Sequence, residues 1–213
     1  MSSTINLLIG LAMGLNLLAL GSSRLPSVIR AVALQGMLLG VMPLVLETHA
    51  DWRTVLVAVV TIAMKGFVIP GLLRRAMRVA KIEREIEPFI GFIPSLLLGA
   101  AGTIAAVAGA RALPLLPEHA GTLLVPGALA SVLTGFVLLI GRVKAIGQVC
   151  GYLILENGIY LFGLLLIQST PLLVESGILL DLVVGVFVIG IIVDRIQRAF
   201  DSLDTRKLTV LRE

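Results

Sequence analysis

Apolar residues dominate the chain in long runs, separated by short stretches that carry polar and charged residues. A helix rises about 1.5 Å per residue, so roughly 20 apolar residues cross the hydrocarbon core of a bilayer. The pattern predicts an all-α, polytopic transmembrane helix bundle of about seven spans, a single integral membrane domain over residues 1–213. The expected spans lie near 4–21, 28–46, 54–73, 89–110, 121–140, 145–167 and 174–193.

Composition agrees with a membrane protein and excludes several other classes. Hydrophobic residues make up 58% of the chain and charged residues only 14%, whereas soluble domains carry roughly 25% charge. The formal net charge is +4, but the basic residues border apolar runs, so we expect no nucleic-acid partner. The single cysteine, Cys150, lies in an apolar run, and His49 and His119 fall in separate loops. We therefore expect no metal site in this chain.

The basic residues are distributed unevenly between alternate loops, which predicts the topology. Only Arg53 and Arg111 lie in the loops after even-numbered spans. Basic residues concentrate on the cytoplasmic side of membrane proteins, which predicts an outside N-terminus and a cytoplasmic C-terminus in the inner (plasma) membrane. The other side holds Arg24, Arg30, Arg74, Arg75, Arg78, Lys81, Arg84, Arg142, Lys144, Arg195, Arg198, Arg206, Lys207 and Arg212.

The connection over residues 74–88 carries charges of both signs at helical spacing. Opposite charges three or four residues apart support a helix, so the third span is expected to extend beyond the membrane. A solvated helix end and a docking site for a cytoplasmic subunit both fit this pattern.

Four polar residues interrupt the apolar runs at similar depth. Glu156 lies about 18 Å along its helix from Lys144, and Asp181 lies about 20 Å from the charged tail. Lys65 and Gln35 lie about 13 and 16 Å from the same side. A charge at the bilayer centre costs at least about 2.5–3.5 kcal/mol, so such residues are usually functional.

The functional interpretation is a proton relay. Glu156 and Asp181 exchange protons, Lys65 modulates their charge, and Gln35 lies in the same layer. Asn157 and Tyr160 join this hypothesis because Tyr160 follows Glu156 by one helical turn and shares its face.

Each polar residue also has a purely structural interpretation. Glu156 as a neutral acid can donate a hydrogen bond between helices, and Asp181 can reach interfacial water. Lys65 can extend its ammonium toward the cytoplasm, and Gln35 can join two helices by hydrogen bonds. Pro70, five residues after Lys65, removes a backbone donor, so either a hydrated break or a simple packing kink is expected there.

A weak internal similarity indicates a 3+1+3 parallel repeat. FVIPGLLRRAMR from Phe67 resembles FVIGIIVDRIQR from Phe187. Residues 1–88 then form the first three-helix unit, residues 89–120 the connecting helix and residues 121–213 the second unit. Because Lys65 and the carboxylates fall in different units, we expect coupling through polar groups or water rather than direct contact.

Several blocks together resemble a known family. GYLILENGIYLFGLLL, VESGILLD, RLPSVIRAVALQG and MKGFVIPGLLRR resemble component E of hydrogenase-4 and formate hydrogenlyase membrane complexes (HyfE). The last three spans are similar to the K-type subunit of respiratory complex I, whose second and third helices each carry a buried glutamate. Glu156 matches the first position, and Asp181 the second with aspartate in place of glutamate.

The resemblance implies a non-catalytic membrane-arm subunit of an oxidoreductase complex that couples electron transport to proton or ion translocation. Its partners would be antiporter-like membrane subunits, a peripheral cytoplasmic redox arm and the lipid bilayer, and it would hold no cofactor itself. Two alternatives remain from the sequence: a stand-alone small transporter and a structural scaffold subunit.

Overall fold

The computed structural model describes residues 2–46, 51–80, 88–113, 121–165 and 190, most of which lie in helices. The π-helix η1 joins α3 and α4 without a break, so the three form one long helix. The elements are α1 (Ser2–Gly21), α2 (Leu25–Leu46), α3 (Trp52–Thr61), η1 (Ile62–Val68), α4 (Ile69–Ala80), α5 (Phe92–Ala110), α6 (Leu124–Gly141) and α7 (Ala145–Leu164).

Within the described residues, 6 helices are long and apolar enough to cross a membrane, with the α3–η1–α4 helix counted as one. They coincide with the first six expected spans, and the third continues to Ala80, while residues 81–87 of its expected extension lie outside the described residues. Apart from residue 190, the expected seventh span, 174–193, lies outside the described residues, and it is the third member of the repeat's second unit. The all-helical fold class is confirmed, and the chain is a multi-pass membrane protein.

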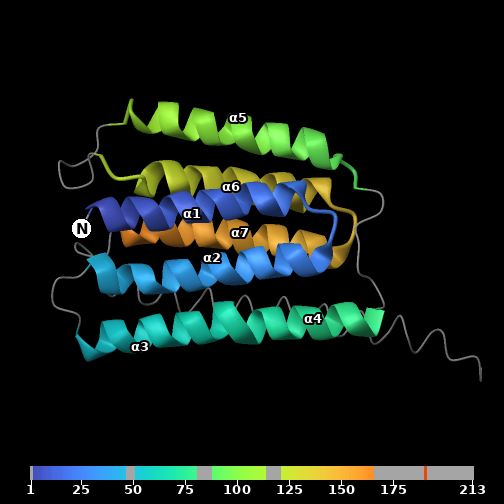
Figure 1. Cartoon of the computed structure of the whole chain (residues 1–213), viewed down its shortest axis with the longest axis horizontal. Coiled ribbons are helices and arrows are strands. Elements are labelled where there is room, and N and C mark those ends of the chain that lie inside the picture. Colours follow the sequence, from blue (N-terminus) through green and yellow to red (C-terminus); the bar gives the residue numbers. More distant parts are fainter. Residues whose placement is uncertain (1, 47–50, 81–87, 114–120, 166–189, 191–213) are drawn as a thin grey trace, which may run out of the picture.

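The helices lie side by side along the long axis of the molecule (Figure 1). α6 and α7 pack on each other, and α1 and α2 pack on this pair. α5 covers α1 and α6 at one edge, while the α3–η1–α4 helix packs on α2 at the other. Because α2 contacts both α7 and η1, it stands between these two helices and brings their polar residues close together.

Glycines allow α6 and α7 to approach backbone to backbone. A Cβ added at Gly158 would lie 2.7 Å from the backbone nitrogen of Val132 and 2.9 Å from the carbonyl oxygen of Ala128. A Cβ at Gly135 would lie 2.5 Å from the backbone nitrogen of Leu155. Small residues permit such close approach in membranes, where van der Waals contact drives helix association. This contact fixes the rotation of α7 and therefore the direction of its polar face.

Gly158→Ala is expected to lower the thermal unfolding temperature of the protein in detergent. The new methyl group meets backbone atoms that cannot move independently, and overpacking of this kind costs about 1–3 kcal/mol. Gly163→Ala is the matched control, because a Cβ at Gly163 on the same helix has no atom within 4 Å. Equal unfolding temperatures for the two variants would contradict the close α6–α7 contact.

Arg142 joins three helix ends at one end of the bundle. It lies in the three-residue turn between α6 and α7, and it is 97% buried, with only 3% of its surface exposed. Its guanidinium donates hydrogen bonds to the carbonyl oxygens of Leu20 (2.6 Å) and Ile90 (3.4 Å) and lies 4.6 Å from the centre of the Phe92 ring. The sequence predicted this short turn and counted Arg142 as a loop charge, but its helix-clamping contacts were not expected.

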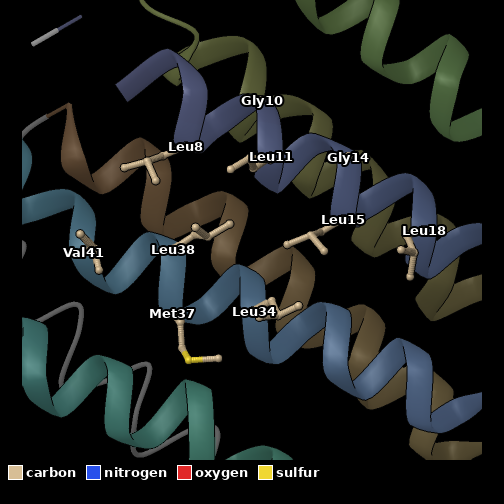
Figure 2. A pocket seen from close by; sticks show the side chains of 10 residues that line it. All are labelled: Leu8, Gly10, Leu11, Gly14, Leu15, Leu18, Leu34, Met37, Leu38 and Val41. Carbon is tan, nitrogen blue, oxygen red and sulfur yellow. The ribbon is translucent and has the colours of Figure 1, made fainter. Parts of the chain in front are cut away.

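An apolar groove of about 550 Å³ runs along the outer surface between α1 and α2 (Figure 2). Leu11 and Gly14 of α1 face Leu34 and Leu38 of α2 across it. Every side chain that lines it is apolar, so the groove lies apart from the polar chemistry of the bundle interior.

Candidate functional site: a buried ion pair with an amide chain

Lys65 and Glu156 form a direct ion pair inside the bundle. The Nζ atom of Lys65 lies 2.7 Å from Oε1 of Glu156, although the residues come from η1 and α7. Only 12% of the Lys65 side chain and 3% of the Glu156 side chain are exposed. Two groups in such contact, shielded from water, interact far more strongly than a surface pair.

The expectation of an indirect coupling between these residues was therefore wrong. It assigned Lys65 and Glu156 to different parts of the bundle, whereas α2 packs on both η1 and α7, and η1 lies almost in backbone contact with α2. A Cβ at Gly36 would lie 2.6 Å from the Cβ of Lys65, and a Cβ at Gly66 would lie 2.5 Å from Cγ of Met37. This close approach lets the lysine side chain reach α7.

Lys65 lies in the middle of the π-helix η1. At its end, the N–H of Ile69 donates to the carbonyl oxygen of Met64, the five-residue spacing of a π turn. Such turns are rare and occur frequently at functional sites. The sequence predicted a disturbance near Pro70, and the structure places it immediately before that proline, as a wider helical turn.

A chain of side-chain amides continues from the ion pair into the bundle. The Lys65 ammonium donates to Oδ1 of Asn157 at 3.0 Å, and Nδ2 of Asn157 donates to Oε1 of Gln35 at 3.2 Å. Nε2 of Gln35 donates to Oδ1 of Asn16 at 2.8 Å, and Nδ2 of Asn16 donates to Oγ of Ser131 at 3.0 Å. The chain thus connects η1, α7, α2, α1 and α6.

The four amide and hydroxyl residues of this chain are almost completely buried. Asn157, Gln35 and Asn16 are each 1% exposed and Ser131 is 0% exposed. Sequence reasoning selected Asn157 and Gln35 but missed Asn16 and Ser131. Both are polar residues inside apolar runs, and this pattern could have identified them. The sequence prediction considered only polar residues at the depth of Glu156.

Tyr160 closes the other side of the lysine. The Lys65 ammonium lies 5.3 Å from the centre of the Tyr160 ring, and Tyr160 is 6% exposed. A cation over an aromatic face is attracted by the ring's quadrupole, and more strongly where water is excluded. Five of the six predicted site residues thus meet at one place: Lys65, Glu156, Asn157, Tyr160 and Gln35. The sixth, Asp181, lies outside the described residues.

Within the parts of the chain that the structure describes, no group of three or more His, Cys, Asp or Glu side chains gathers in a way that would hold a metal ion.

Comparison with known proteins places the chain in a family. No family model matches it, and no solved structure matches significantly. It is 34% identical over 191 residues to the uncharacterized protein Rv0085 of Mycobacterium tuberculosis (strain ATCC 25618 / H37Rv). The alignment covers 89% of this chain and 87% of Rv0085. The chain belongs to the Rv0085 family.

A partial similarity extends beyond the Rv0085 family. Hydrogenase-4 component E of Escherichia coli (strain K12) and that of Shigella flexneri are each 34% identical to this chain over 85 residues. The matched stretch is 40% of this chain and 39% of component E. A relationship to component E is thereby supported over that part, and the likeness to the K-type subunit of complex I stays a prediction.

Proposed function

We propose that this chain is a non-catalytic membrane subunit of a hydrogenase-like, redox-driven complex that translocates protons or other ions, and that the Lys65–Glu156 pair lies on the translocation pathway. The buried ion pair in the interior of a membrane-spanning bundle carries the proposal. The partial similarity to hydrogenase-4 component E supports the type of complex.

Energetics favour a functional role for the pair over a structural one. Well-packed apolar residues often stabilise a fold as well as a buried ion pair does, or better by about 1–4 kcal/mol. Packing alone therefore gives little reason to keep Lys65 and Glu156 inside a bilayer. A carboxylate beside an ammonium, in contrast, can bind and release a proton while the neighbouring charge keeps its ionised form accessible.

The roles in this proposal follow from the chemistry of each group. Glu156 binds and releases the proton, and Lys65 stabilises the ionised carboxylate across 2.7 Å. Asp181 is the second proposed carboxylate, and Tyr160 lies against the ammonium. The amides of Asn157 and Gln35 do not ionise at physiological pH, so their proposed role is to orient the lysine rather than to carry protons.

The proposed partners are antiporter-like and other membrane-arm subunits, together with a peripheral cytoplasmic redox arm. Purification in mild detergent tests this assembly directly. The chain is expected to co-purify with hydrogenase-like subunits. A chain that purifies alone and transports a solute in liposomes would overturn the proposal in favour of a stand-alone transporter.

A structural scaffold is the second candidate, and the amide chain favours it, because side-chain amides join transmembrane helices. The two candidates differ at Glu156. In a scaffold, substitutions of Glu156 change assembly and translocation together, whereas a relay residue affects translocation in a complex that remains intact.

The proposed orientation places the C-terminus in the cytoplasm and the N-terminus outside. A reporter fused after Glu213 is expected to be cytoplasmic and a tag at Met1 to be accessible from outside, because basic residues are retained on the cytoplasmic side. Selective labelling of intact cells and of inverted vesicles measures both. Detection of both termini on one side would require an even number of spans and would contradict the predicted seventh.

A further inference from the structure

The hydrogen-bond chain between Lys65 and Ser131 runs in one direction only. Lysine donates to Asn157, Asn157 to Gln35, Gln35 to Asn16 and Asn16 to Ser131. Each of the three amides accepts through its oxygen on the lysine side and donates through its nitrogen on the far side.

The chemistry of the ammonium enforces this direction. An ammonium has three donors and no acceptor, so Asn157 must turn its oxygen toward Lys65. Its nitrogen then faces Gln35, which must accept with its own oxygen, and the same reasoning passes through Asn16 to the Ser131 hydroxyl. The charge on Lys65 therefore sets the orientation of the Asn16 amide, although three hydrogen bonds separate the two side chains.

The reverse influence follows from electrostatics. All three amide dipoles turn their negative ends toward the ammonium, and aligned hydrogen bonds polarise and strengthen one another where the local dielectric is low. The chain thus stabilises the lysine cation as water would, without supplying a group that exchanges protons. The ammonium that the chain contacts lies 2.7 Å from Glu156.

We propose that Asn16 and Ser131 are positioning residues that set the pH range in which Glu156 exchanges its proton, acting on Lys65 through the aligned amide chain. The inference rests on the proposed function and extends it to two residues that touch neither charge. Among the described residues, the titratable groups facing Lys65 are Glu156 and Tyr160, both on α7, whereas α2 presents Gly36 to it.

The test measures Glu156 itself in the purified complex in membranes. Infrared difference spectra across a pH series report its protonation, and Glu156→Gln identifies the carboxyl band. Asn16→Leu is expected to move the midpoint of this titration upward by about 0.5–1 pH unit, because a less stabilised ammonium supports the ionised carboxylate less well. Ser131→Ala, which removes only the last acceptor, is expected to move it in the same direction by a smaller amount.

Thr134→Val is the matched control. Thr134 lies three residues after Ser131 on α6, and it is 1% exposed. Its hydroxyl makes no hydrogen bond to the described residues. Loss of this buried hydroxyl is expected to leave the midpoint unchanged. A shift equal to that of Ser131→Ala would mean that any hydroxyl lost from α6 disturbs the site, and would overturn the inference.

A double-mutant cycle separates action through lysine from a general structural effect. Lys65→Ala alone is expected to raise the midpoint, and Asn16→Leu added to it should produce no further shift, since the chain then has no cation to act on. Equal shifts by Asn16→Leu with and without Lys65 would overturn the inference. If Asn16→Leu fails to assemble, Ser131→Ala decides alone, and an unmoved midpoint overturns the inference.

Failure of the inference and failure of the proposed function are distinguishable. Normal ion translocation by Glu156→Gln would contradict the relay role of Glu156. The titration of the Glu156 carboxyl band in the other variants would still test whether the amide chain acts on Glu156. Conversely, the titration midpoint of Glu156 could respond to Lys65→Ala but not to Asn16→Leu or Ser131→Ala. That result would rule out an influence of the amide chain on Glu156 and leave the proposed relay role in place.

Discussion

Glu156→Gln is expected to leave the complex assembled and the redox reaction partly active, while ion translocation falls at least roughly tenfold. Glutamine keeps the volume and hydrogen-bonding capacity of the side chain, but it cannot bind and release a proton at physiological pH. The position is 2% exposed and its carboxylate pairs with the Lys65 ammonium at 2.7 Å. Redox-driven acidification in inverted membrane vesicles measures the effect.

Asp51→Asn provides the matched control for this substitution. Asp51 is exposed at the start of α3, where its carboxylate accepts a hydrogen bond of 2.7 Å from the N–H of Trp52. Asparagine caps helices as well as aspartate does, so this variant loses the same charge without disturbing the fold. Translocation at the wild-type rate in Asp51→Asn and in Glu156→Gln alike would defeat the relay role of Glu156.

The spans could be predicted closely from the sequence, because membrane helices follow from one-dimensional properties. The predicted run 28–46 became α2 from Leu25, and the run 145–167 became α7 from Ala145. A helix satisfies its backbone hydrogen bonds within its own segment, so it can cross a bilayer without help from its neighbours. Length and apolar content are therefore enough to predict which segments span the membrane. The same local information predicted the very short turn at Arg142–Lys144.

The site could be predicted only in part, because it depends on how the helices pack. Depth counting brought Glu156, Lys65 and Gln35 into one layer, but contact between lysine and glutamate depends on the Gly36 and Gly66 approach of α2 to η1. Hydropathy carries no signal for that approach. The π turn around Lys65 could not be predicted either, because Pro70 indicates a break in the helix but not its form.

Lys65→Ala is expected to shift the pH optimum of coupled turnover upward by about one unit or more, and Lys65→Arg by less. Removal of one partner from a buried ion pair leaves the other charge uncompensated, at a cost of about 3–5 kcal/mol, so Glu156 retains its proton to higher pH. The contact of 2.7 Å makes this effect larger than indirect coupling across the bundle would. Turnover measured across a pH series in membrane vesicles gives the shift.

A double variant separates the electrostatic role of the lysine from its structural role. Lys65→Ala alone leaves the buried Glu156 carboxylate unpaired and is expected to lower the amount of assembled complex. Lys65→Met together with Glu156→Gln removes both charges, so the penalty for an unpaired buried charge disappears and assembly is expected to recover. Translocation should not recover, because the proton-exchanging group is absent. An unchanged pH profile in Lys65→Ala, with normal assembly, would mean that the ammonium does not act on Glu156. Recovered assembly without recovered translocation, in contrast, would identify the pair as a functional element that the fold does not need.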